Sequence, residues 1–159
     1  MSSPPSIDVA VVIERRRAPN RWQEWSFTVA EVLLDDGSFG TAPRTLRDDG
    51  STCSVLHPGL RVSLHRDEAE GYHLNLTSDR PVWFVMWRID DADASRAWPE
   101  LVTLSYNEAA RWLDAQESVD NVPLLPQVAA ELQAFTDLHY RPEPRKRRRP
   151  ASFQSPDQR

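Results

Sequence analysis

The sequence predicts an α+β domain: a mainly antiparallel β-sheet, closed as a barrel or folded as a sandwich, followed by two C-terminal helices. Three observations predict it. Short runs with a period of two recur over the first hundred residues. Asp-Gly pairs and prolines separate these runs. Helical spacing of apolar residues is found only after Ser105. Strands first and helices last is the usual order of an α+β fold.

Length and charge divide the chain into a body and a tail. The 159 residues suit one domain, which we place at 1–140. That body carries 12 arginines and 22 acidic residues, a net charge of −10, whereas residues 141–159 carry seven basic and two acidic residues, a net charge of +5. We expect the basic tail to be disordered. The acidic body is a poor surface for nucleic acid, because phosphate binding requires a basic patch.

Two strands are predicted near the N-terminus. The first is predicted because the β-branched residues Ile7, Val9, Val11 and Ile13 alternate with Asp8, Ala10, Val12 and Glu14. After a basic turn, the run from Trp25 to Leu34 has the clearest strand pattern of the chain and ends at an Asp-Gly turn. We expect this second strand to bury one face and the rest of the chain to cover it.

The middle of the chain is predicted to consist of short hairpins. A strand at 44–47 pairs with one at 52–56, which His57-Pro58-Gly59 then ends. Strands at 60–66 and 72–77 form a further hairpin, with His65 opposite His73 on its polar face.

The last third is predicted to hold two strands and both helices. Val82 to Trp87 is apolar on both faces, so it is a central strand or one covered by later helices or a partner. A short strand follows at 101–104. A Ser105-x-x-Glu108 capping box starts a helix at about 106–117, a linker at 121–123 follows, and Val128, Leu132, Phe135 and Leu138 form the stripe of a helix at about 126–139.

Cysteine content and hydropathy indicate the compartment. Cys53 is the only cysteine, so no internal disulfide can form, and its acidic neighbours Asp48 and Asp49 favour an unreactive thiol. The first apolar run is too short for a signal sequence, and no stretch reaches the roughly 20 apolar residues of a membrane helix. We expect a cytoplasmic protein without a membrane span.

Six tryptophans are many for one domain of this size. Tryptophan and arginine are common at the centres of interfaces, and a guanidinium stacks well on an indole. We therefore predict a partner-binding surface, or alternatively a cap on the core, from the residues Arg21, Trp22, Trp25, Trp83 and Trp87. The predicted core includes Phe27, Val29, Leu64, Leu74 and Phe84.

Catalytic and metal-binding motifs are weak. His65 and His73, opposite each other on the predicted hairpin, are candidate ligand-binding residues, and a metal would need a third ligand such as His57, Asp67 or Glu70. Because the spacing of a tight metal site is missing, we predict no metal, no cofactor and no catalytic residue. The five glycines are not clustered, which argues against a phosphate-binding loop.

Several short segments resemble a bacterial family of unknown function, DUF3305. The resemblance covers roughly residues 7–149 and rests on Val9–Arg16, Asn20–Gln23, Leu64–Arg66, Tyr72–Leu76, Ser105–Ala110, Val119–Pro123 and His139–Pro144, together with the basic tail.

The resemblance implies an association with molybdoenzymes, because genes of this family often lie beside formate dehydrogenase genes. It implies no catalytic residues. We therefore expect a non-catalytic accessory or scaffold protein that binds a subunit or maturation factor of a formate dehydrogenase-like system. The alternative is a small-ligand protein or a pterin- or nucleotide-related enzyme of molybdenum cofactor metabolism, which would bring His65, His73 and Arg21 together in a pocket.

Overall fold

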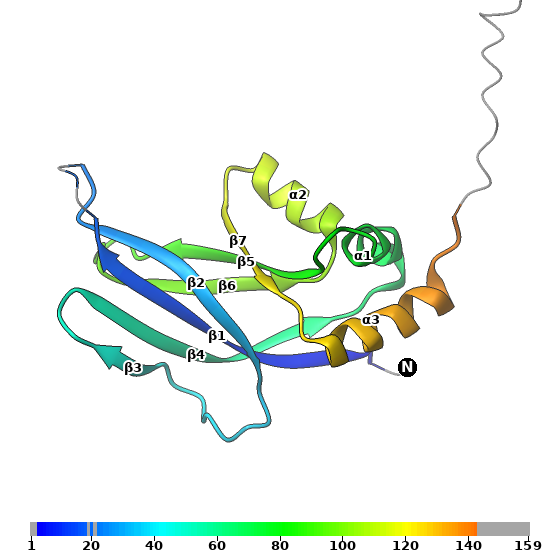
Figure 1. The fold of residues 1–159 in the computed structure, drawn as a ribbon, viewed down its shortest axis with the longest axis horizontal. Helices are drawn as coiled ribbons and strands as arrows, with labels where there is room; N and C mark the ends of the chain where they lie inside the picture. Colours follow the sequence, from blue (N-terminus) through cyan, green and yellow to red (C-terminus); the bar gives the residue numbers. More distant parts are fainter. Residues whose placement is uncertain (1–2, 19, 21, 143–159) are drawn as a thin grey trace, which may run out of the picture.

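The computed structural model describes residues 3–18, 20 and 22–142, which form two antiparallel sheets and three α-helices (Figure 1). This confirms the predicted α+β class. Neither sheet closes into a barrel in the described part of the chain, so the packing is that of a sandwich.

The four-stranded sheet has the order β2-β1-β4-β3, from β1 (Ser6–Arg17), β2 (Trp25–Leu34), β3 (Arg44–Asp48) and β4 (Thr52–Ser63). The three-stranded sheet has the order β6-β5-β7, from β5 (Val82–Ile89), β6 (Ala97–Thr103) and β7 (Ser118–Pro123).

Strand β2 buries alternate side chains, as its sequence predicts, but its inward face changes parity part of the way along. Val12 pairs with Glu31 and Ile13 pairs with Val29, so Ala30 is an extra residue in the ladder. Such a bulge shifts the side-chain alternation by one position. Val29 and Val32 are therefore both buried, although their numbers differ in parity.

Strand β4 runs through His57-Pro58-Gly59, where the sequence predicted a break. Val9 pairs with Leu60 and Val11 pairs with His57, so β4 carries one extra residue there. Gly59 has a φ of 84°, a conformation that other residues adopt rarely. The turn-forming residues thus produce a bulge rather than the end of the strand.

The predicted hairpin at 60–77 is wrong. Strand β4 ends at Ser63, a 3-10 turn spans Arg66–Glu68, and α1 spans Ala69–Leu76. As a consequence Leu74, predicted to lie in the core, points from a helix and is 40% exposed.

Strand β5 is central in its sheet and buried on both faces, as predicted. Trp83 and Val85 face the other sheet, and Phe84 makes an edge-on ring contact with Tyr106, the first residue of α2 (Tyr106–Asp114). The Ser105 hydroxyl accepts a hydrogen bond from the Glu108 N–H, which confirms the predicted cap.

The last elements correct one prediction and confirm another. The predicted linker at 121–123 belongs to β7, which pairs with β5. The predicted second helix is present as α3 (Pro126–His139), with Val128, Leu132 and Phe135 buried and Leu138 exposed.

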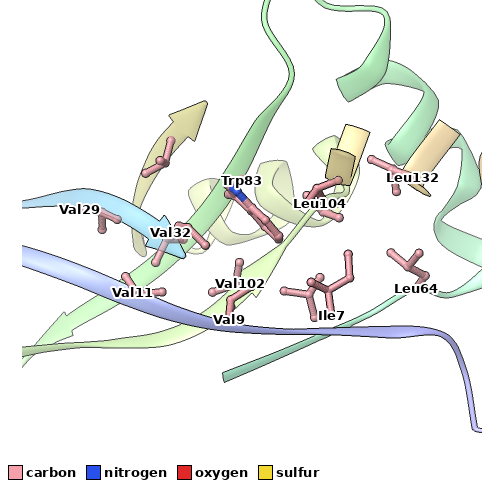
Figure 2. Packing of buried hydrophobic residues seen from close by; sticks show 14 of the residues in the cluster. Ile7, Val9, Val11, Val29, Val32, Leu64, Trp83, Val102, Leu104 and Leu132 are labelled. Atoms are coloured by element: carbon pink, nitrogen blue, oxygen red, sulfur yellow. The ribbon is translucent and has the colours of Figure 1, made fainter. Parts of the chain in front are cut away.

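The main core fills the space between the sheets, and Figure 2 shows the Trp83 indole among the side chains of Val32 (β2), Val102 (β6) and Leu104, which follows β6. Val29, Leu64 and Phe84 are buried as predicted, whereas Phe27 is half-buried against this core. A smaller cluster of Ala10, Val12 and Leu56 lies on the outer face of the four-stranded sheet, packed against Phe39.

The two ends of the sandwich differ. Helices α1 and α3 lie at one end, which we call the helical end, and the β1–β2, β3–β4 and β5–β6 turns lie at the other, the turn end (Figure 1). The predicted disordered tail falls outside the described residues from position 143 onward.

Candidate functional site: an arginine–tryptophan cluster and a cleft at the turn end

Two arginines of β1 lie against one tryptophan of β2. Arg17 pairs with Trp25 across the ladder and Arg15 pairs with Phe27, two positions along. Because residues two apart on a strand share a face, both guanidinium groups reach the same indole. Their Cζ atoms lie 4.3 Å (Arg15) and 4.8 Å (Arg17) from the centre of the Trp25 ring, within cation–π range.

Arg15 also connects the two sheets. Its Nη1 donates a hydrogen bond of 2.7 Å to the carbonyl of Ser95 in the β5–β6 turn. Its Nε is buried and has no hydrogen-bond acceptor among the described residues. The guanidinium is therefore held from two sides while part of its donor capacity is unused.

The β1–β2 turn places Trp22 beside this cluster. Asn20 Oδ1 accepts hydrogen bonds from the backbone N–H groups of Trp22 (3.1 Å) and Gln23 (2.7 Å), which fixes the turn. The Trp22 residue is 87% exposed. The predicted stacking of an arginine on a tryptophan is thus found at Trp25, with Arg15 and Arg17 as the arginines. Arg21 lies outside the described residues.

The other two predicted partner-binding tryptophans face inward. Trp83 is fully buried between the sheets, so its placement on a surface is wrong. Trp87 is half-buried against the same core, with its ring centre 5.9 Å from that of Phe27. The cause is the central position of β5, whose inward face both residues share.

The two candidate histidines do not form a pair. His65 is exposed just before the 3-10 turn, whereas His73 lies on α1 with its ring stacked 4.4 Å from that of Tyr140. The predicted opposition fails because residues 69–76 are helical. Within the described ranges, no three His, Cys, Asp or Glu residues are grouped so that they could hold a metal ion.

A cleft that the sequence did not predict opens at the turn end. It has a volume of about 540 Å³. We define it by residues of β1 to β4, of the loop before β3, of the β5–β6 turn and of the start of β6: Ile13, Arg15, Phe27, Pro43, Thr45, Asp48, Cys53, Val55, His57, Asp90, Ser95, Arg96, Ala97 and Trp98. It exists because the exposed edge strand β3 extends the four-stranded sheet beyond the part that the smaller sheet covers.

The polar groups of the cleft are of both signs. Hydrogen bonds from the Ser95 hydroxyl and N–H lower the pKa of neighbouring Asp93, and the charges of Arg96 and Arg15 add to this. Burial lowers the pKa of His57, which favours the neutral imidazole. Its Nε2 is buried without an acceptor or donor among the described residues. Cys53 is buried on the cleft floor.

Sequence reasoning missed Arg15 and Arg17 as site residues, and it named His57 only as a possible third ligand of a metal. A signal for the first two was present: Arg15-x-Arg17 continues the inward alternation of Ile7 to Ile13, so both arginines project from the core-facing side of β1. No local signal identifies His57, because its place in the cleft depends on how the sheets overlap.

Comparison with known proteins gives one match. The family described as "Protein of unknown function (DUF3305)" matches residues 8–149. Searches of curated proteins and of solved structures find no match. In the described part of the chain, every helix is too short or too polar to cross a membrane.

Proposed function

We propose, from the premise that the chain belongs to the DUF3305 family, that the protein is a non-catalytic accessory protein that docks a protein partner at its turn end. The observation that carries the proposal is the arginine–tryptophan cluster, in which Trp25 is held by Arg15 and Arg17 beside the exposed Trp22. The partner that the family resemblance suggests is a subunit or maturation factor of a formate dehydrogenase-like molybdoenzyme.

The composition of this surface favours protein binding. Tryptophan and arginine can each contribute several kcal/mol at an interface from which water is excluded. The pairing with Trp25 restricts both guanidinium groups before a partner arrives, which lowers the entropy cost of docking. A surface of this kind binds best to a partner that offers carboxylates and an apolar pocket.

Charge supports an acidic partner surface. The segment from Glu14 to Trp25 carries four arginines and two glutamates, whereas the first 140 residues as a whole carry a net charge of −10. The Arg17–Glu24 ion pair is long at 3.4 Å, and both side chains are more than 60% exposed. Such a pair is worth little, so Arg17 can exchange Glu24 for a carboxylate of the partner at small cost.

The alternative is a small-ligand protein or an enzyme of molybdenum cofactor metabolism, and it expected His65, His73 and Arg21 to share one pocket. His65 and His73 lie in different surroundings, and Arg21 lies outside the described residues. The cleft at the turn end is a different cavity with different residues, and it supports ligand binding in its own right.

The test is binding of the full-length protein to purified subunits and maturation factors of the host formate dehydrogenase, measured by biolayer interferometry. Trp22→Ala and Arg17→Ala should each weaken binding by about tenfold or more. Arg61→Ala and Leu138→Ala are the matched controls, since Arg61 is an exposed ion-paired arginine on β4 and Leu138 an exposed apolar residue on α3. Both controls should bind within about twofold of wild type.

Two results would reject the proposal. If folded Trp22→Ala and Arg17→Ala bind as wild type does, the docking surface lies elsewhere. If the wild-type protein binds none of these subunits and instead turns over a pterin or a nucleotide, the enzyme alternative is correct. Far-UV circular dichroism and a thermal melt establish that each variant is folded.

A further inference from the structure

We propose that the cleft at the turn end binds a small organic anion: a carboxylate carried on a compact apolar group. The inference shares Arg15 with the proposed docking surface, but it also rests on Arg96 and the cleft floor, and its tests use neither Trp22 nor Arg17. The volume of about 540 Å³ lies within the range of small-molecule sites.

The floor of the cleft is graded from apolar to polar. Val55 of β4 pairs with Ile13 of β1 on one side and with Thr45 of β3 on the other. These three residues form a row across the strands that is apolar except for the Thr45 hydroxyl. The next row toward the turns pairs Cys53 with Arg15 and with Asp48. A ligand with its apolar group on the first row would therefore place its charged group near Arg15.

Arg15 is prepared to receive an oxyanion. The Trp25 ring and the Ser95 carbonyl fix its guanidinium, and no described residue accepts a hydrogen bond from its Nη2. No carboxylate among the described residues lies within 4 Å of a nitrogen of Arg15 or Arg96. The charge of Asp93 acts on both arginines from a longer distance. A guanidinium that is fixed in this way and has no carboxylate in contact has donors free for the two oxygens of a ligand carboxylate.

The acidic residues of the cleft are engaged by their own turns. Asp48 accepts a hydrogen bond of 3.1 Å from the N–H of Gly50, and Asp90 accepts one of 2.8 Å from the N–H of Ala92. Each carboxylate thus stabilises the turn that bears it instead of neutralising an arginine. Burial lowers the pKa of the half-buried His57 and so favours its neutral form, which leaves the arginines as the positive groups that face the cleft.

The test uses simple carboxylates with an uncharged isostere. Benzoate, phenylacetate and hexanoate are titrated into the full-length ¹⁵N-labelled protein, with benzamide as the control for charge. The carboxylates should shift the amide signals of Ile13, Val55 and Ala97, which line the cleft. Benzamide should bind at least about fivefold more weakly, because it lacks the ionic contact to Arg15.

Variants locate the site. Arg96→Gln, at an exposed residue, and Arg15→Gln should each weaken benzoate binding by about threefold to tenfold. Thr45→Trp should block the cleft from an exposed edge position, and Thr28→Trp is its matched control on the outward side of β2. If Arg15→Gln does not fold, Arg96→Gln and Thr45→Trp still decide the outcome.

Two sources of the carboxylate can be told apart. A dipeptide, N-acetyl-valyl-phenylalanine, is compared with its C-terminal amide. Tighter binding of the free acid than of benzoate, lost on amidation, indicates the C-terminus of a polypeptide as the natural ligand. Equal or weaker binding indicates a free small acid.

The inference is overturned if none of these carboxylates shifts the cleft amides at about 10 mM, a concentration at which fragment-sized ligands of a built site bind. It is equally overturned if benzoate and benzamide bind alike, or if Thr45→Trp leaves binding unchanged. Failure here leaves the partner-binding results for Trp22→Ala and Arg17→Ala unaffected, so the two proposals fail separately.

Discussion

At the helical end, α1 and α3 fill the space beyond the strands with buried apolar side chains, whereas at the turn end the same space is left as a cleft. Leu64, Tyr72, Leu132 and Phe135 close the helical end, and the Tyr72 and Phe135 rings meet edge to face at 5.9 Å. No helix among the described residues covers the turn end.

Buried polar groups show the same difference. Asn75, 1% exposed, donates to the carbonyls of Val82 and Leu104 and accepts from the N–H of Val82. At the turn end, Arg15 Nε and His57 Nε2 are buried without partners among the described residues, and the indole N–H groups of Trp83 and Trp87 on β5 are likewise buried without partners. Satisfied buried groups stabilise a fold, and unsatisfied ones are tolerated where a site needs them. The helical end holds a buried side chain with all of its hydrogen bonds made, whereas the polar groups left unpaired at the turn end, Arg15 and His57, lie at the cleft for which we propose binding.

The largest expected difference is in the free energy of unfolding of two variants, Trp83→Ala in the core and Trp25→Ala at the turn end. Trp83→Ala should lower the free energy of unfolding by about 3–5 kcal/mol, because it removes a fully buried side chain and leaves a cavity. Trp25→Ala should cost only about 1 kcal/mol, because it removes a half-buried ring and its cation–π contacts with Arg15 and Arg17. Urea unfolding measures both, and equal costs would show that the turn end is as important for stability as the core.

Asn75 tests how much the buried side-chain hydrogen bonds of the helical end contribute to stability. Asn75→Ala should cost about 3 kcal/mol, since it leaves backbone groups of Val82 and Leu104 buried and unpaired. Asn121→Ala, at an exposed position of β7, is the control and should change stability by less than about 0.5 kcal/mol. A loss below about 1 kcal/mol for Asn75→Ala would mean that the freed backbone groups are reached by water.

Gly71 tests how closely the helices pack. A Cβ at this buried position of α1 would meet Ser105 Oγ and lie 3.1 Å from the backbone nitrogen of Asn107, at the start of α2. Gly71→Ala should therefore destabilise by about 1–3 kcal/mol, through overpacking, despite the higher helix propensity of alanine. Leu74→Ala on the exposed side of the same helix is the control. A stabilised Gly71→Ala variant would show that α1 and α2 move apart easily.

Local patterns predicted the elements whose signal lies within one run of residues. The period of two in β1 and β2, the continuous apolar run of β5, the Ser105 cap of α2 and the stripe of α3 were read correctly. The segment 60–77 was not, because Tyr72-His73-Leu74-Asn75-Leu76 fits a period of two as well as a helix. The acidic residues Asp67, Glu68 and Glu70 favour a helix start and were read as a turn. Strand β7 was missed because Asn121 and Pro123 resemble a linker, although proline is tolerated at the end of an edge strand.

The candidate site was predicted only in part, for a different reason. A surface cluster of arginine and tryptophan was expected and Trp25 belongs to it, but its arginines come from β1 across the ladder. The cleft joins residues from all four strands of one sheet to the β5–β6 turn and the start of β6 in the other. Such an arrangement depends on how far one sheet extends past its neighbour, which no local pattern encodes.

The smallest expected effect concerns pH and the half-buried His57. Burial lowers its pKa in the folded protein below the ordinary 6.5, so the unfolded chain binds the proton more readily. The stability that comes from the neutral imidazole is complete above pH 6.5 and is lost as the pH falls below that value. Wild type should therefore lose more unfolding free energy than His57→Gln between about pH 7.5 and about pH 5.5 in urea titrations.

Hydrogen bonds lower the pKa of Asp36 and Asp93 below 3.8, so these carboxylates change charge outside the window. Equal losses for the two proteins would mean that solvent reaches the imidazole, and the cleft would then be wetter and less selective for an apolar ligand than we infer.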